Sequence, residues 1–194
     1  MTSPAATRGR EVRLRLLDAA AELIAERGWA AVSTRILAER AGVTPSVVHY
    51  HFPSLPALLR EAAVGAMRQV LAEVDAVLRT ARTPAEAVDA MLTAVREYTG
   101  TDPRSLLAVE AYLAAGRDPR LRARIGELVE EFQHRLGRWL AEHGVPSAGE
   151  TAGVLAAALD GLLLRRGLEV GPAPEPTTAV LRRLVEPEGE GGQA

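Results

Sequence analysis

The chain has 194 residues with a formal net charge of −2, and 47% hydrophobic and 25% charged residues indicate a soluble globular protein rather than a disordered one. It contains no cysteine, which excludes a disulfide framework and a thiolate metal site. No apolar run is long enough to span a membrane, and the first ten residues lack the apolar core of a secretory signal, so we expect a cytoplasmic protein without membrane contact.

The predicted fold is all-α, because apolar residues recur at i, i+3, i+4 and i+7 along almost the whole chain and the alternating runs typical of strands are missing. The first predicted helix covers residues 11–27 and ends at Gly28. Residues 1–10 precede it and are expected to form a flexible arm.

Two short helices follow in quick succession. Ser33 is a suitable N-cap for a helix over residues 34–41, which Gly42 terminates. Thr44 is a suitable cap for a third helix over residues 45–51, and proline at its first position costs no hydrogen bond.

The rest of the chain predicts longer helices. One over residues 56–81 would extend roughly 40 Å at ~1.5 Å per residue and connect two domains. Prolines and glycines divide the remainder into helices at about 84–99, 103–115, 119–143, 148–168 and 177–185, with a proline-rich loop at 171–176. The predicted domains are 1–55, 56–186 and a disordered tail, 187–194.

The three N-terminal helices and their tight turns have the spacing of a helix-turn-helix, which places its third helix in the DNA major groove. Residues 1–60 hold eight arginines and five acidic residues, a net charge of +3, which leaves −5 for the rest of the chain. A basic head suits DNA contact. Ordinary helical bundles also contain short helices, and so small a charge difference also arises by chance.

The residues themselves resemble a known family. The stretch 33–54, STRILAERAGVTPSVVHYHFPS, preceded at the proper distance by 17–29, LDAAAELIAERGW, is similar to the signature of the TetR family of bacterial transcriptional regulators. The similarity covers about 50 residues without a gap. It implies an N-terminal helix-turn-helix and a larger helical domain that dimerises and binds a small molecule.

The resemblance implies DNA contacts at the start of the second helix and along the third. An arginine such as Arg35 can bind guanine or phosphate through two parallel hydrogen bonds, although a solvated surface arginine is the alternative. His49 replaces the tyrosine that the family most often has, and Tyr50 is expected to contact phosphate or a base, whereas His51 and Phe52 are expected to pack the domain. The predicted DNA-binding residues are Thr34, Arg35, Thr44, Pro45, Ser46, Val47, His49 and Tyr50.

Two positions depart from the family pattern. Leu55 stands where the family has a phosphate-contacting lysine, and Ile36 stands where an acidic residue is usual. The loss of a cationic contact predicts modest affinity and a shallower salt dependence. Arg8 and Arg10 could compensate by touching the DNA backbone or minor groove, and a solvated arm is the alternative.

The segment 148–168 is apolar nearly all round, so it needs cover on two sides. A second subunit is the simplest cover, as in the four-helix interface of the family, and a membrane surface is the alternative. The predicted interface residues are Leu155, Leu159, Leu162, Leu163, Leu181 and Leu184. A two-fold dimer would read a palindromic operator.

The resemblance also implies an effector pocket among the middle helices. Tyr98, Glu110 and Tyr112 combine polar tips with apolar surroundings, which can orient a ligand. Plain core packing is the alternative for each candidate. The candidates are Met67, Leu71, Met91, Val95, Tyr98, Leu107, Glu110, Ala111, Tyr112 and Trp139. The implied function is a repressor that an unidentified small molecule releases from its operator.

An enzyme and a dimeric adaptor with a vestigial head are the rival classes. The only catalytic fragment is Glu131 with His134, half of the pattern that a di-iron site requires, and no second half exists. We therefore predict no catalytic residues, no metal and no cofactor, and expect Glu131 and His134 to form a surface pair.

Overall fold

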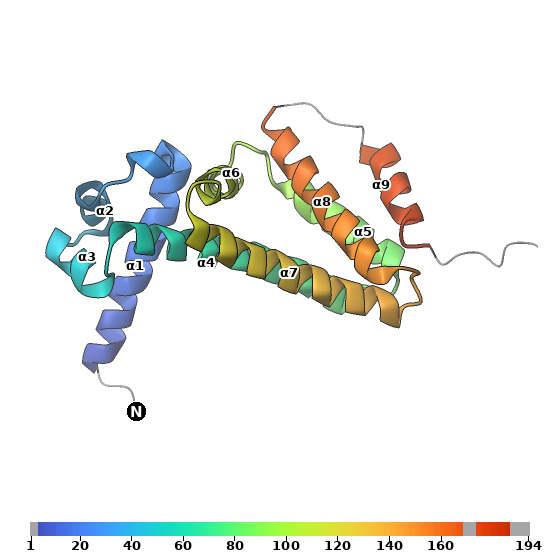
Figure 1. Cartoon of the computed structure of the whole chain (residues 1–194), viewed down its shortest axis with the longest axis horizontal. Helices are drawn as coiled ribbons and strands as arrows, with labels where there is room; N and C mark the ends of the chain where they lie inside the picture. Colours follow the sequence, from blue (N-terminus) through green and yellow to red (C-terminus); the bar gives the residue numbers. More distant parts are fainter. Residues whose placement is uncertain (1–3, 169–173, 187–194) are drawn as a thin grey trace, which may run out of the picture. The chain divides into compact units, whose positions relative to one another are not determined.

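The computed structural model describes residues 4–168 and 174–186, and these residues form an all-helical fold, as predicted (Figure 1). One short 3-10 helix, η1, accompanies the α-helices. The elements are α1 (Pro4–Arg27), η1 (Trp29–Ala31), α2 (Thr34–Ala41), α3 (Pro45–His51), α4 (Leu55–Thr80), α5 (Pro84–Glu97), α6 (Pro103–Ala115), α7 (Pro119–Glu142), α8 (Ala148–Arg166) and α9 (Pro174–Arg183). Among the described residues, no helix is long and apolar enough to cross a membrane.

Two helices begin earlier than predicted. α1 begins at Pro4, so residues 4–10 are helical, and the prediction of a flexible arm there is wrong. Alanine and arginine favour a helix in this segment, and they outweigh the cost of a single glycine. α9 begins at Pro174, because prolines are tolerated in a first helical turn. The predicted tail, 187–194, lies outside the described residues.

The chain folds into two compact units. The first unit comprises Met1–Arg68 and Pro103–Ile125, and the second comprises Gln69–Asp102 and Gly126–Ala194. The division falls inside α4 and α7, and not at the predicted domain boundary between residues 55 and 56. The reason is that α6 packs on α1, which adds α6 to the N-terminal helices.

One hydrophobic core holds the first unit together. Leu16 and Leu23 of α1, Leu37 of α2 and Leu58 of α4 are completely buried in it, and α6 contributes Leu107. Burying a leucine side chain contributes about 1.5–3 kcal/mol. α3 contributes Val48, so five helices share this core, and the short helices α2 and α3 are held by packing rather than by their own propensity.

An ion pair ties α4 to the start of α7 within the first unit. Arg60 Nη1 donates to Asp118 Oδ2 at 2.8 Å, while Oδ1 of the same aspartate accepts from the backbone N–H groups of Arg120 and Leu121 at 2.9 and 3.1 Å. The hydrogen bond from Arg60 is the main reason that the pKa of Asp118 lies below its ordinary value of 3.8. Asp118 therefore both caps α7 and fixes it to α4.

Asp118→Asn is expected to remove about 1 kcal/mol of stability at neutral pH and to flatten the acid limb of the stability curve. The folded-state pKa of Asp118 is lowered, so its contribution is complete above about pH 5 and is lost as pH falls from its ordinary pKa through the lower folded-state pKa. Urea unfolding between about pH 6 and pH 2.5 measures both effects. Glu142→Gln removes an exposed carboxylate at the end of α7 as a control; equal acid limbs in all three proteins would contradict the assignment.

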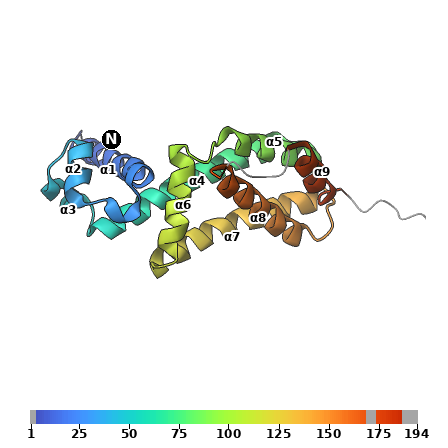
Figure 2. The ribbon, with the colours of Figure 1, turned by 90° about the horizontal axis from the view of Figure 1, so that it is seen from above.

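The second unit has its own core between α5, α7, α8 and α9, with the second half of α4 (Figure 2). Met91, Leu136, Leu140 and Leu155 are its most completely buried large side chains. Arg135 of α7 adds an ion pair with Asp75 of α4, with Nη2 and Oδ2 3.1 Å apart. α8 and α9 therefore pack against α4, α5 and α7 through this core.

Candidate nucleic-acid interface

Local sequence signals define α2. The Ser33 hydroxyl accepts a hydrogen bond from the backbone N–H of Ile36 at 3.4 Å, which caps the first turn. At the other end Gly42 adopts the left-handed conformation with φ 66°, and Val43 N–H donates to Ala38 C=O at 3.0 Å. This Schellman arrangement ends α2 sharply and directs the chain into α3.

α3 begins at Pro45, as predicted, but Thr44 does not cap it with its side chain. The Thr44 hydroxyl instead lies 2.8 Å from the Ser46 hydroxyl, in hydrogen-bonding distance. At the end of the helix Phe52 N–H donates to Val48 C=O at 2.9 Å, and both side chains are buried in the first-unit core. The buried pair fixes which face of α3 points outward.

The outward face of α2 and α3 carries the predicted DNA-binding residues. Tyr50 is the extreme case, since 86% of this large side chain is exposed, and its ring meets His51 edge-on with the centroids 5.1 Å apart. Thr34 and Val47 are half-buried, and the exposed members of the set are Arg35, Thr44, Pro45, Ser46, His49 and Tyr50. Folding therefore brings the predicted residues to two adjoining helices and leaves six of them open to solvent.

Ion pairs fix α2 to α1 and leave the outward face of α2 and α3 exposed. Arg40 donates to Glu26 and Glu22 of α1, at 2.6 and 3.1 Å, and its hydrogen bonds lower the pKa of Glu26. Arg35 makes only the exposed pair with Glu39 one turn away, with Nε and Oε1 3.0 Å apart. Such a pair is weak, so Arg35 can exchange it for a DNA phosphate or base at little cost.

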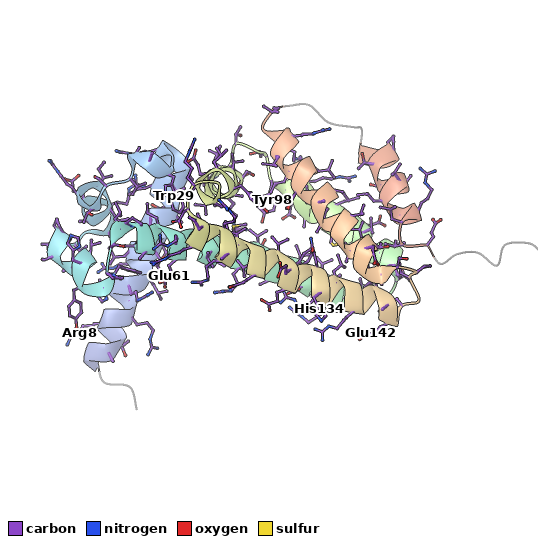
Figure 3. All side chains as sticks on the ribbon, viewed as in Figure 1. Arg8, Trp29, Glu61, Tyr98, His134 and Glu142 are labelled. Atoms are coloured by element: carbon purple, nitrogen blue, oxygen red, sulfur yellow. The ribbon has the colours of Figure 1, made fainter. Side chains whose placement is uncertain are left out.

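A second set of contacts supports the end of α3 against α1 and α4. The guanidinium carbon of Arg13 lies 4.4 Å from the centre of the Phe52 ring, and Arg13 Nη2 donates to Glu61 Oε2 at 2.8 Å. Glu61 lies on α4 (Figure 3). This hydrogen-bonded pair lowers the pKa of Glu61 and raises that of Arg13. Sequence reasoning missed these contacts, because 48 residues separate the two partners.

The N-terminal turns of α1 add positive charge beside this interface. Arg8 and Arg10 are exposed on the helical segment that precedes the buried part of α1 (Figure 3). Leu55, at the family's lysine position, is the first residue of α4 and packs against the first-unit core. A helix, rather than a flexible arm, therefore carries these two arginines.

The predicted effector-pocket residues fall into both units, five in each. The first unit contains Met67, Leu107, Glu110, Ala111 and Tyr112, and the second contains Leu71, Met91, Val95, Tyr98 and Trp139. Leu107 and Met91 are core residues with 5% and 2% exposure. The Tyr98 hydroxyl donates to Glu73 at 3.2 Å.

Glu110 has a structural role that the sequence did not indicate. Its carboxylate accepts a hydrogen bond from the backbone N–H of Trp29 at 2.7 Å, and so links α6 to η1 (Figure 3). A Cβ built on Gly28, which has φ 82°, would lie 3.5 Å from the same carboxylate. The hydrogen bond satisfies an otherwise open donor at the start of η1 and attaches α6 to the DNA-binding head.

Two other predictions need correction. Leu155 and Leu181 are buried in the core of their own unit, with 1% and 6% exposure, so they are not surface residues for a partner.

Glu131 pairs with Arg135 at 2.6 Å rather than with His134, because an arginine one turn away makes the stronger pair. Among the described residues, no group of three acidic or histidine side chains could hold a metal.

The fold and this exposed face define a helix-turn-helix regulator of transcription. The chain belongs to the TetR family: residues 16–62 match the model of the bacterial regulatory proteins of the tetR family, and residues 82–187 match the tetracyclin repressor-like C-terminal domain. The family comprises DNA-binding transcriptional regulators and not enzymes.

Relatives and solved structures agree with this assignment over most of their length. The HTH-type transcriptional regulator BetI of Rhizobium meliloti is 28% identical over 82% of this chain and 80% of its own. A transcriptional regulator of Streptomyces coelicolor A3(2) has a TM-score of 0.75 and 33% identity, with 90% of this chain and 98% of the other covered. The multidrug binding protein EbrR, solved with imidazole, has a TM-score of 0.70 and 31% identity, with 91% and 90% covered.

Proposed function

We propose that this regulator is a repressor that binds a palindromic operator as a homodimer and is released by a small-molecule effector. The observation that carries the DNA-binding part is the outward face of α3, on which an almost fully exposed tyrosine stands opposite two buried anchors. The phenol and the ring of this tyrosine are free to reach the phosphates and base edges that a groove of DNA offers.

Apolar side chains exposed along α8 and α9 support a dimer. Val154 and Leu164 lie on one stripe of α8, which also includes Ala157 and Gly161 at spacings of three and four residues, and the exposed Leu168 follows in the turn after the helix. Val180 of α9 and Leu184, which follows the last residue of that helix, are exposed as well, at 47% and 39%. A second copy of this surface would cover both stripes, with Leu184 retained from the predicted interface set. Leu163 is half-buried and lies about 100° around the helix from Leu164, outside the stripe.

The effector part of the proposal rests on relatives. EbrR is named a multidrug binding protein, and its structure holds imidazole. In the second unit of this chain Tyr98 and Glu73 form a polar pair, and the unit also contains half-buried apolar residues such as Leu71 and Val95. A small apolar molecule with one polar group would suit such surroundings.

Selection of bound sequences from a random duplex library tests the DNA-binding mode. We expect a palindrome whose half-site centres lie about 34–36 Å apart, one helical turn of DNA. The same probe then allows a screen for molecules that release the protein. Recovery of a single, unrepeated half-site would contradict the dimer, and recovery of no sequence at low salt would contradict operator recognition by this chain.

Gly161→Leu is expected to weaken the dimer without harming the single chain. A Cβ built on Gly161 meets no atom within 4 Å, so the larger side chain has room until a partner helix approaches. Light scattering should show a shift toward the monomer, and operator affinity should fall with it. Gly126→Leu on α7 is the matched control, since its Cβ also meets no atom within 4 Å; a Gly161 variant that stays as dimeric as this control would exclude the α8 face.

A further inference from the structure

A groove between α5 and α9 lies within the second unit. Its volume is about 380 Å³, which is in the size range of small-molecule sites. Figure 2 shows the two helices beside each other. The lining residues, none of which the sequence singled out, are Asp89, Thr93, Arg96, Thr178, Ala179 and Arg182.

The helical spacing explains why these side chains meet. Asp89, Thr93 and Arg96 lie at i, i+4 and i+7 on one face of α5. Thr178 and Arg182 lie at i and i+4 on α9. Val180, on the proposed dimer stripe, is two residues from each of them and therefore points to nearly the opposite side of α9. Dimerisation through that stripe would leave the groove open.

The groove has an excess of positive charge. Its one carboxylate, Asp89, is occupied by Arg182, which donates through both Nε, at 2.7 Å, and Nη2. Arg182 Nη1 makes no hydrogen bond to the described residues. Glu186 acts on Arg182 only through its charge. The two arginine side chains of the groove therefore have more N–H donors than the groove has acceptors for them.

Arg96 is the least satisfied of these cations. Among the described residues its guanidinium donates only to the Thr178 hydroxyl, at the long distance of 3.4 Å. Arg166 of α8 donates to the backbone carbonyl of Arg96 at 3.0 Å, which brings a third guanidinium to the same end of α5. An arginine fork with open donors matches the geometry of a carboxylate or a phosphate.

We propose that this groove is a binding site for a small anion, either an organic carboxylate or a phosphate, held by the Arg96 guanidinium with Arg182 Nη1 as the second donor. The bound anion lies between α5 and α9 and stabilises their packing. The site goes beyond the proposed repressor function, because it requires neither an operator nor the effector that releases it. Its ligand is defined by the oxyanion and by a body that fits about 380 Å³.

Isothermal titration and thermal unfolding of the full chain test the proposal. The probes are sodium benzoate and inorganic phosphate, each compared with sodium chloride at equal ionic strength. We expect at least one of them to bind saturably and to raise Tm. Benzoate alone would identify a carboxylate site and phosphate alone a phosphate site. If neither probe binds at 10 mM, the proposal is overturned, because roughly this concentration marks the weakest affinity that matters for a metabolite.

Arg96→Gln is the decisive variant, and it should weaken binding about tenfold or more, because a hydrogen bond to a charged group is lost. Arg138→Gln, which removes an exposed arginine of α7, should bind as the wild type does. Thr178→Val removes the hydroxyl that accepts from Arg96, so it should also change the affinity, and it keeps the question answerable if Arg96→Gln unfolds. Equal affinities for the wild type and both groove variants would mean an adventitious ion only.

Discussion

Replacing Tyr50 with alanine is expected to weaken operator binding by about 10- to 100-fold and to leave the stability of the fold unchanged. A hydrogen bond from the phenol to a phosphate is charge-assisted and contributes about 1.5–3 kcal/mol, which corresponds to this range. The ring is 86% exposed and lies outside the first-unit core, so its removal should change the free energy of unfolding by less than about 0.5 kcal/mol. Fluorescence anisotropy with the selected operator, alongside urea unfolding, measures both quantities.

Two further variants separate the phenol from general surface effects. Tyr50→Phe keeps the ring and its edge-on contact with His51, so it should lose nearly as much affinity if the hydroxyl makes the phosphate contact. Leu113→Ala removes a 60% exposed side chain of α6 in the same unit and should bind DNA as the wild type does. If Tyr50→Ala binds with wild-type affinity, the exposed face of α3 does not contact DNA through this residue.

The helix-turn-helix could be predicted almost residue by residue because its boundaries depend on local chemistry. Ser33 and Gly42 each act on atoms within four residues of themselves, so the bounds of α2 follow from short stretches of sequence. The later helices begin at Pro84, Pro103 and Pro119 for the same kind of reason. The predicted DNA-binding residues share one face because α2 and α3 were correctly placed.

Contacts between distant segments could not be predicted in this way. The Trp29 N–H is satisfied by Glu110, which is 81 residues away, and this contact is part of what adds α6 to the DNA-binding head. α8 shows the limit of hydrophobic periodicity. Because that helix is apolar nearly all round, its sequence does not distinguish the side chains facing its own core, such as Leu155, from those left exposed, such as Val154.

The groove between α5 and α9 was hidden for a related reason. Asp89 and Arg182 are 93 residues apart, and each taken alone resembles an ordinary charged residue on a helix surface. Only the packing of α9 on α5 brings them together with Arg96. The charge pattern along one helix therefore does not indicate the pairing that forms a site.

Gly100→Ala is expected to cost about 3 kcal/mol or more, the largest stability loss of any substitution considered for this chain. Gly100 is buried and has φ 81°, a conformation that costs other residues about 1–2 kcal/mol. A Cβ there would also clash with the backbone N of Gly167 and would lie 2.6 Å from the carbonyl carbon of Arg166. Relief requires the end of α8 to separate from the α5–α6 connection, so the dimer stripe on α8 should be disturbed as well.

Gly42→Ala separates the two causes of this loss. Gly42 has a similar φ of 66°, but a Cβ there meets no atom within 4 Å, so its replacement should cost only the conformational part, about 1–2 kcal/mol. Urea unfolding measures how much more stability Gly100→Ala loses than Gly42→Ala. This difference is the cost of separating the two backbones that cross at Gly100 and Gly167. That difference should appear together with a weaker dimer, since the same crossing fixes the C-terminal end of α8. Equal losses at the two glycines would show that the backbones part freely and that this crossing does not hold α8 in place.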